Sequence, residues 1–345
     1  SNGGSVSEIS PLANTLLTWE KGRKVNVGLD LTLLKNRLTL SADYYNDYYY
    51  DILQSRGKSI QLLGIAYPAE NIGKTRYYGL ETQLSWQDHI GKVNYYVSAN
   101  WSMEQNKRLF MDEQYVPYDY LKMTGQPTGT IYGLVATGFL TAKDIADGYP
   151  VMNGFNNIQA GDVKYKDMNG DGEITPEDRT MIGNPTPKVT YGFSLGVDYK
   201  NWSLGIDMMG QGGNKIFRTW DNYNFAQFNY LEQRLDRWHG EGTSNTQPLL
   251  NTKHSINNLN SDYYIEDGKF FRIRNVQLAY TFDKSLIAKI RLQALKVYVN
   301  IQNLKTWKHN TGYTPELGGT ATAFGVDDGS YPVPAVYTFG INLTF

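Results

Sequence analysis

Strict alternation of apolar and polar residues is the dominant pattern along this chain, and it recurs in segments of about 9–13 residues. From Val25 to Leu33, for example, every second residue is apolar and the residues between are small or polar. The pattern predicts about nine strands, each with one apolar and one polar face. They cover residues 25–33, 38–44, 78–86, 93–101, 189–197, 202–208, 276–282, 295–301 and 337–345.

The polar faces of these strands are rich in Gly, Ser, Thr and Asn, which suits a crowded barrel lumen better than the solvated face of a sandwich. On the apolar faces, aromatic residues gather near the ends of the segments, where membrane barrels carry interfacial girdles. Ordinary aromatic packing in a sheet core is the alternative. The aromatic residues concerned are Tyr44, Tyr78, Trp86, Trp101, Tyr199, Trp202, Phe282, Tyr337 and Phe345.

The connections between the predicted strands alternate between short and long. Outer-membrane barrels show this alternation because short turns face the periplasm and long loops face outward. Phe345 then lies on the periplasmic side. Because a closed bacterial barrel needs an even number of strands, an odd count indicates the C-terminal part of a larger all-β, antiparallel transmembrane barrel. The short connections cover residues 34–36, 87–91, 200–201 and 283–291, and the long ones cover 51–75, 105–187, 213–268 and 305–335.

Composition narrows the functional classes. The 345 residues include 27 Tyr, and 14% of the chain is aromatic, which suits either a water–lipid boundary or a carbohydrate-binding surface. A net charge of -1 disfavours nucleic-acid binding, and the lack of cysteine excludes disulfides and thiolate metal sites. There is no apolar run long enough for a transmembrane helix, and the first residues lack the features of a signal peptide.

One motif predicts a metal site. Residues 167–178 place oxygen-bearing side chains at positions 1, 3 and 5, a glycine at position 6 and an acid at position 12, as in a calcium loop. We expect a structural Ca²⁺ ion in a long external loop, with the alternative that this is an Asx-rich turn that binds nothing. The expected ligands are the side chains of Asp167, Asn169, Asp171 and Asp178 and the backbone carbonyl of Glu173.

Other residues give weaker signals. Aromatic residues between Trp220 and Trp238 could contact a ligand or partner, or could fold the loop onto itself, and residues 230–238 could form a short helix. The adjacent acids Glu177–Asp178 and Asp327–Asp328 are more typical of solvated turns than of a glycosidase pair. The four histidines lack metal-ligand spacing, so we predict no catalytic site and no enzyme.

Taken in order, these features resemble the SusC/RagA-type TonB-dependent outer-membrane transporters of Bacteroidota over nearly the whole chain. The motifs that carry the resemblance are Leu17–Lys21 with Asn26–Asp30, Ala42–Tyr45, Asn71–Gly73 with Gly79–Glu81, Gly125–Pro127 with Tyr132–Gly133, the 167–178 loop with Ile182–Pro187, Phe271–Val276, Asn300–Leu304 and the terminal Phe345.

The resemblance implies a barrel of about 22 strands that is occluded by an N-terminal plug. It also implies a SusD-like surface lipoprotein as a lid, and uptake of oligosaccharides or peptides across the outer membrane powered by the TonB complex. Residues 1–345 are then expected to form the C-terminal part of the barrel domain in outer-membrane lipid. The plug, the signal peptide, the first strands and the region that contacts TonB are expected to lie outside this chain. The alternative is a soluble or secreted β-rich carbohydrate-binding protein with a structural calcium loop.

Overall fold

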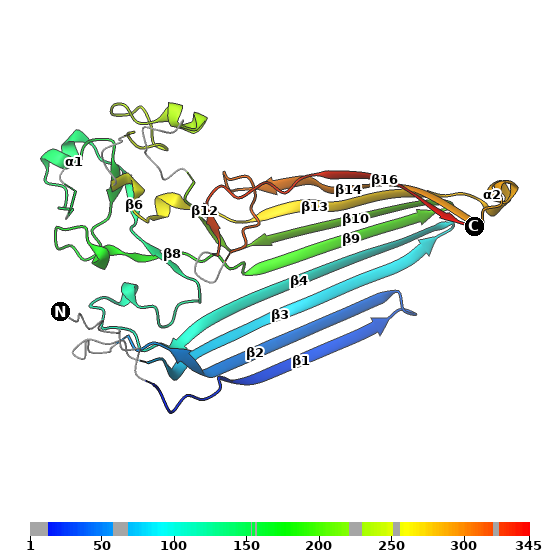
Figure 1. The fold of residues 1–345 in the computed structure, drawn as a ribbon, viewed down its shortest axis with the longest axis horizontal. Coiled ribbons are helices and arrows are strands. Elements are labelled where there is room, and N and C mark those ends of the chain that lie inside the picture. Colours follow the sequence, from blue (N-terminus) through cyan, green and yellow to red (C-terminus); the bar gives the residue numbers. More distant parts are fainter. Residues whose placement is uncertain are drawn as a thin grey trace, which may run out of the picture.

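The computed structural model of the chain describes residues 13–57, 68–152, 154–155, 157–220, 230–250, 256–319 and 324–345. Its main feature is one antiparallel sheet of nine strands in the order β1-β2-β3-β4-β9-β10-β13-β14-β16 (Figure 1). This confirms the predicted strand count. The strands are β1 (Lys21–Leu33), β2 (Leu38–Gln54), β3 (Glu70–Ile90), β4 (Val93–Phe110), β9 (Val189–Tyr199), β10 (Trp202–Gly212), β13 (Phe270–Thr281), β14 (Ala294–Lys308) and β16 (Val336–Thr344).

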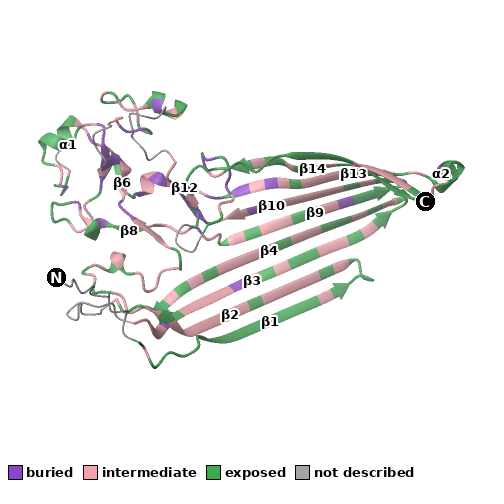
Figure 2. Cartoon of the chain, viewed as in Figure 1, coloured by how far each residue is buried: buried purple, intermediate pink, exposed green. Residues whose placement is uncertain are grey.

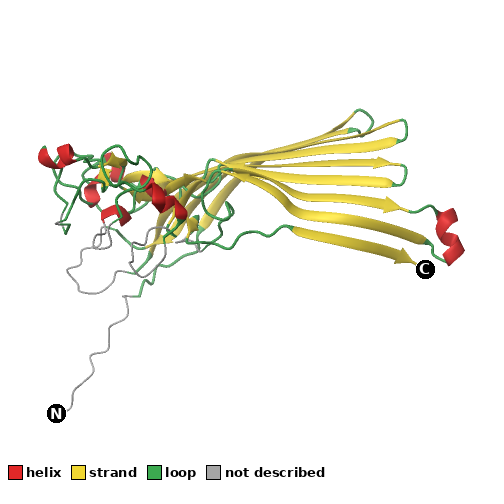
Figure 3. Ribbon diagram, turned by 90° about the horizontal axis from the view of Figure 1, so that it is seen from above, coloured by secondary structure: helices red, strands yellow, loops and turns green. Residues whose placement is uncertain are grey.

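Short and long connections lie at opposite ends of this sheet. The short turns, the helix α2 (Lys284–Ile287) and the C-terminus lie at one end, and the long connections lie at the other (Figures 1 and 3). This arrangement agrees with the predicted alternation of connection lengths. The chain therefore presents two chemically different rims, of which only one carries large folded loops.

Several strands run further into the long connections than the alternation predicts. The predicted loop 51–75 was too long at both ends, because β2 reaches Gln54 and pairs it with Glu70 at the start of β3. The register shifts after Tyr50, where Asp51 has a positive φ of 57°. This bulge and the adjacent tyrosines of β2 interrupt the alternation of apolar and polar residues, so the sequence alone does not predict that the strand continues.

The apolar face of the sheet is exposed. Val27 is 65% exposed, Leu29 50% and Phe339 68%. Within the described ranges no second sheet covers these side chains, as a sandwich would require. None of the nine aromatic residues assigned to the girdles is buried, which disfavours ordinary core packing for them. The face therefore needs apolar surroundings that lie outside the chain.

The buried core of the chain lies in the long loops instead. We call residues 111–188 and 213–269 the loop module. Buried residues gather there, whereas the large sheet is mostly exposed or intermediate (Figure 2). The core cluster consists of Leu134, Met152, Val163, Tyr165, Ile174 and Ile256. It is framed by small sheets that pair β5 (Ile131–Gly133) with β8 (Thr180–Gly183) and β6 (Ala136–Phe139) with β7 (Val163–Tyr165).

A third small sheet connects the loop module to the segment before the last strand. It joins β11 (Lys215–Arg218) to β12 (Ile265–Asp267) and to β15 (Val326–Asp327).

In the part of the chain that the structure describes, helices are few and short. They are α1 (Ala142–Ala146), α2, and the 3₁₀ turns η2 (Asp119–Leu121), η3 (Pro176–Asp178), η4 (Glu232–Asp236), η5 (Ile256–Asn258), η6 (Asp262–Tyr264) and η7 (Ala288–Ile290). The short helix predicted over residues 230–238 is present as η4. Among the residues that the structure describes, no helix is both long and apolar enough to cross a bilayer.

Candidate functional site

The polar face of the sheet is hollowed between β4 and β14. The hollow has a volume of about 1010 Å³. On its wall Ser194 Oγ donates to Asp207 Oδ1 over 2.7 Å, and Asn275 Nδ2 lies 3.4 Å from Asp207 Oδ2. The wall also has uncharged amides, among them Asn100, Gln277, Asn300 and Gln302, and charged residues, namely Arg272, Arg274 and Glu316. Such amides can both donate and accept hydrogen bonds, so the wall suits a polar solute that has many hydroxyl or amide groups.

A buried arginine closes the loop end of this hollow. Arg272 on β13 is only 4% exposed, and its Nε donates to Thr306 Oγ1 over 2.7 Å. A guanidinium nitrogen also pairs with the carboxylate of Glu316. Because a buried charge is costly without a partner, the pair ties β13 to β14 and to the segment around residue 316.

A second hollow of about 770 Å³ lies nearer β1 and is more acidic. Tyr45 Oη donates to Glu104 Oε2 over 3.2 Å, and Tyr49 Oη donates to Asp47 Oδ2 over 3.3 Å. Glu81 also contributes to its wall. The polar face thus has an acidic, tyrosine-rich part and a part that is richer in uncharged amides.

The two halves of the loop module are joined by side chains that lie far apart in the sequence. Asn257 Oδ1 accepts from the backbone N–H of Val163 over 2.7 Å, and Asn257 Nδ2 donates to Asp162 Oδ1 over 3.0 Å. The hydroxyl of Tyr165 donates to the carbonyl of Ile256 over 2.8 Å. All five residues are buried. The loops above the sheet therefore form one folded unit.

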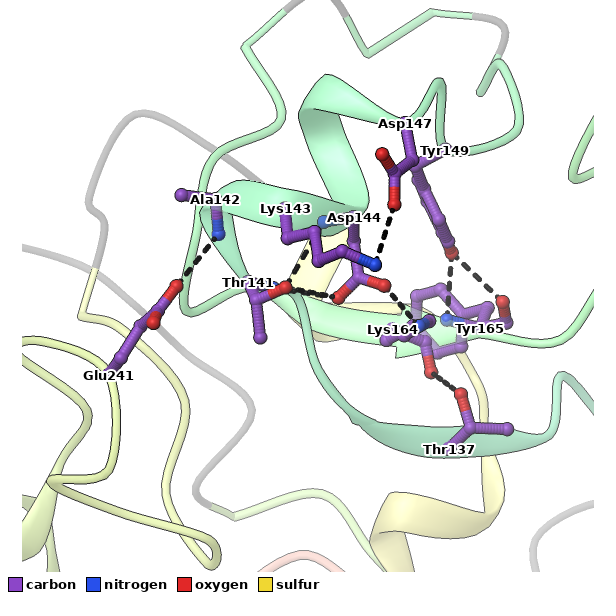
Figure 4. Close-up of polar contacts among 10 residues, drawn as sticks. All are labelled: Thr137, Thr141, Ala142, Lys143, Asp144, Asp147, Tyr149, Lys164, Tyr165 and Glu241. Atoms are coloured by element: carbon purple, nitrogen blue, oxygen red, sulfur yellow. Dashed lines mark hydrogen bonds and ion pairs between the residues drawn. The ribbon is translucent and has the colours of Figure 1, made fainter.

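An ordered polar network surrounds α1 on the surface of this module (Figure 4). Thr141 and Asp144 form a capping box at the start of the helix, and Lys164 Nζ lies 2.5 Å from Asp144 Oδ1. The hydrogen bond from Lys164 is the main cause that lowers the pKa of Asp144 to about 2. Across the module, Glu241 accepts from the N–H of Ala142 over 3.2 Å.

A tyrosine pair lies beside this network, also in Figure 4. The hydroxyl of Tyr149 accepts from the backbone N–H of Tyr165 over 2.8 Å and donates to its carbonyl over 3.0 Å. Burial raises the pKa of Tyr149 to about 12. Its hydroxyl therefore stays neutral and satisfies both backbone groups of one residue.

The predicted calcium loop forms a tight turn. Asp167 accepts from the backbone N–H groups of Gly170 and Gly172 over 2.6 and 2.9 Å, and the N–H of Gly172 is the main cause that lowers the pKa of Asp167. The Oδ1 atom of Asn169 accepts from the N–H of Asp171 over 3.1 Å. Both glycines have positive φ values, of 77° and 85°, as a sharp turn at position 6 requires.

The remaining predicted ligands are placed differently. Asp178 is fully buried, and its two oxygens accept from the N–H groups of Met168 and Thr175, each over 2.7 Å. Glu173 donates its own N–H to Asp171 Oδ1 over 2.8 Å. Within the ranges described, no three His, Cys, Asp or Glu side chains are grouped so that they could hold a metal ion.

The donor chemistry of the loop still fits calcium. Asp167, Asn169 and Asp171 would hold the ion, since they offer hard oxygens at the loop surface and each carboxylate oxygen keeps a second lone pair. Asp178 acts here as a clamp that joins both ends of the turn. The calcium site remains a prediction.

The aromatic loop is only partly described, since Tyr223, Phe225 and Phe228 lie outside the described residues. The ring of Trp238 lies directly over Gly161, where a Cβ atom would come within 2.2 Å of it. The Arg218 guanidinium lies 5.6 Å from the ring centroid of Trp220. At both tryptophans the loop therefore packs against the protein itself. Tyr230 is partly exposed.

In each adjacent carboxylate pair one acid is buried and has a structural role, so the prediction of solvated turns is wrong for Asp178 and Asp327. Asp178 caps η3, and Asp327, which is 1% exposed, accepts from the N–H groups of Gly329 and Ser330. His239 contacts the carbonyl of Arg237, and His254 lies outside the described residues.

Sequence reasoning missed the residues that organise the site, namely Arg272, Asp207, Asp162 and Asn257. Arg272 gave a signal, because it is a charge in the middle of a strand-like run from Phe271 to Val276. Asn257 gave none, since its partners are 94 and 95 residues away.

Comparison with known proteins supports the family relationship. Residues 2–304 match the family described as "TonB dependent receptor-like, beta-barrel". TonB-dependent receptor P3 of Formosa agariphila is 27% identical over 372 residues, which cover 98% of this chain and 35% of that protein. TonB-dependent receptor SusC of Bacteroides thetaiotaomicron is 24% identical over 361 residues, which cover 96% and 32%. The chain thus spans about a third of the length of these curated relatives.

Solved structures show the same fold. The RagAB peptide transporter matches with a TM-score of 0.76 at 22% identity, over 98% of this chain and 36% of that chain. The RagAB peptide importer in its "open-open" state matches with a TM-score of 0.74 at 21% identity, over 98% and 36%. The family is not one of enzymes. With its one-sided apolar sheet, the chain belongs to the TonB-dependent receptor-like β-barrel family and forms part of an outer-membrane β-barrel.

Proposed function

We propose that this chain is the C-terminal part of the barrel of a TonB-dependent importer. The importer brings oligosaccharides or peptides across the outer membrane together with a SusD-like surface lipoprotein. One observation carries the proposal. The nine-stranded sheet exposes an apolar face on one side and a hollowed polar face on the other, with a folded loop module at one rim.

The open edges of the sheet support a larger barrel. β1 and β16 each pair with only one strand among the described residues. In a bilayer the unpaired backbone groups of such edges are too costly to persist, so further strands must join them. A barrel of roughly 22 strands would need about 13 more, together with a plug and a region that contacts TonB.

The chemistry of the wall supports the substrate class. Seven of the residues that line the larger hollow are uncharged amides, which suit the hydroxyl groups of an oligosaccharide and the backbone groups of a peptide equally well. Peptides have a further argument, since the RagAB complex of similar fold is described as a peptide transporter. A SusD-like lid would dock on the rim that carries the loop module.

The calcium loop forms part of this proposal. An ion held by Asp167, Asn169 and Asp171 would brace the turn next to the clamp of Asp178 and stabilise the module.

Uptake measurements test the proposal. A strain that lacks the intact gene is complemented with the wild-type gene or a variant, and import of fluorescent oligosaccharides and peptides is followed with and without TonB. Asn300→Trp narrows the hollow and should reduce uptake several-fold. The matched change Val299→Trp, on the exposed apolar face of the same strand, should leave uptake unchanged. Uptake that does not depend on TonB, or equal effects of both variants, would contradict the proposal.

The soluble carbohydrate-binding alternative makes an opposite prediction. A protein of that class should stay monomeric without detergent and bind glycan. The exposed apolar face predicts aggregation without detergent and a gel mobility that changes on heating.

A further inference from the structure

The corner between β13 and β14 differs from the other short turns, because it contains α2 and η7 (Figure 1). Leu286 and Ile290 are 55% and 64% exposed there, although both are large and apolar. Leu286 lies in α2, and Ile290 lies four residues further along the chain at the end of η7. Ile287 is only 2% exposed and anchors the corner from another side. The corner, residues 283–292, therefore presents an apolar face without a protein cover.

The same corner is basic. Lys284, Lys289 and Arg291 are all exposed, and none of them forms an ion pair with a residue that the structure describes. The carboxylate of Asp283 is turned toward the neighbouring strand connection, where Asn201 Nδ2 donates to it over 2.9 Å. Three cations and one carboxylate give this short segment a positive charge.

The corner follows directly after an aromatic cluster on the outward face of the sheet. The ring centroids of Trp202 and Tyr280 are 4.8 Å apart, and those of Tyr280 and Phe282 are 4.9 Å apart. Aromatic girdles of this kind mark the membrane interface. Lys284 comes two residues after Phe282, so their Cα atoms lie at most about 7 Å apart, and the headgroup layer on each side of a bilayer is about 5–8 Å thick.

We propose that this corner docks on the anionic phospholipid surface of the leaflet that surrounds this rim. Leu286 and Ile290 insert below the headgroups, and Lys284, Lys289 and Arg291 contact the lipid phosphates. Lipid is the occupant because the apolar pair continues the lipid-facing surface beyond the girdle, and because the flanking cations complement anionic headgroups. The inference rests on the membrane location of the barrel and is independent of the imported substrate.

These 345 residues contain no cysteine, so once any cysteine elsewhere in the intact protein is replaced by serine, a single introduced cysteine can be labelled selectively. An environment-sensitive fluorophore is attached to the intact protein in vesicles at Leu286→Cys or Ile290→Cys, and at Ala288→Cys as a control at an exposed small residue between them. Quenching by lipid-chain spin labels is compared with quenching by aqueous iodide. We expect lipid quenching at positions 286 and 290 at least about twofold stronger than at position 288.

Val299→Cys, on the exposed face in the middle of β14, reports barrel insertion separately. If lipid quenches position 299 but iodide alone quenches position 286, the corner does not dock on lipid while the barrel assignment stands. If lipid quenches neither position, both the corner inference and the membrane location fail.

The headgroup contacts are tested with the variant Lys284→Gln/Lys289→Gln/Arg291→Gln. In vesicles of phosphatidylcholine with or without phosphatidylglycerol, the preference of the position-286 probe for anionic lipid should fall on the order of fivefold for each charge removed. Lys143→Gln, an exposed lysine of the loop module, should leave that preference unchanged. An equal preference in the triple variant and the wild-type protein would overturn the role of the cations.

Discussion

The sheet and the loop module bury their apolar residues in different ways. In β1, Val27 is 65% exposed, whereas Val163 and Ile256 in the module are fully buried. In β2, residues 38–50 have ladder partners in both β1 and β3, whereas the module also uses side chains such as Asn257 to satisfy its backbone. One chain thus holds a part that depends on a lipid solvent and a part that carries its own core.

The largest expected effect is a loss of stability in the loop module that leaves the sheet unchanged. Ile256→Ala removes a fully buried side chain from the core cluster and should lower the free energy of unfolding of the module by about 2–5 kcal/mol. Hydrogen exchange with mass spectrometry should then show faster exchange in peptides around Leu134 and Val163. If hydrogen exchange became equally faster in β9 and β10, the sheet and the loop module would not be stabilised independently.

The converse change breaks the sheet. Val299→Arg places a charge on the exposed apolar face of β14 and should cost about 2–4 kcal/mol if that residue lies near the middle of the bilayer. Asn300→Arg, the next residue and a wall residue of the hollow, should cost less than about 1 kcal/mol. Urea-dependent folding into vesicles measures both, and similar costs would mean that the two faces are not distinct in environment.

A smaller effect is expected from the tyrosine pair. Tyr149→Phe deletes the hydroxyl that binds both the N–H and the carbonyl of Tyr165, so the module should lose about 1–3 kcal/mol. Tyr313→Phe serves as the control, because that side chain is 70% exposed and its change should fall within about 0.5 kcal/mol. Local hydrogen exchange at Tyr165 is the appropriate measurement.

The Asp144–Lys164 pair predicts a dependence on pH. The pKa of Asp144 is lowered to about 2, so its stabilisation is fully present above the ordinary carboxyl pKa near 3.8 and is lost as the pH falls through about 2. Because solvent screens this partly exposed ion pair, we expect it to contribute about 1 kcal/mol to the free energy of unfolding. Thermal unfolding of the module, measured from about pH 5 down to about pH 2, should show this loss in the wild-type protein but not in Asp144→Asn.

The smallest predicted effect is the binding of calcium to the loop. With the affinity typical of extracellular modules, about 1 mM calcium should stabilise the module by ~0.5–1 kcal/mol. Terbium luminescence, excited through nearby aromatic residues, measures occupancy directly. Asp171→Ala should abolish it, and Asp147→Ala, an exposed aspartate outside the loop, should not. No luminescence in the wild-type protein would leave the turn as a purely hydrogen-bonded one.

The sequence predicts the sheet better than the module, for a physical reason. Strand alternation is local, so the faces of β1, β9 and β16 can be recognised from the chain itself, as can the turn between Tyr199 and Trp202. At the loop end of β2 the bulge at Asp51 breaks the period, and the prediction there fails. The core of the module has no period, because Val163 and Asn257 meet only after folding.

The same limit applies to the candidate site. The 167–178 motif predicts the turn and its glycines, since these follow from neighbouring residues. The burial of Asp178, by contrast, depends on tertiary packing, and the spacing of residues in the motif does not predict it.

The joint between Asp162, Val163 and Asn257 has a consequence for how such proteins diversify. Because one core is assembled from two separate loops, neither loop can be exchanged between paralogues on its own without exposing the partners of the other. Substitutions at residues 162–165 and 256–261 are therefore expected to covary. A recombinant that inherits both segments together should keep its fold and acquire the surface of its donor.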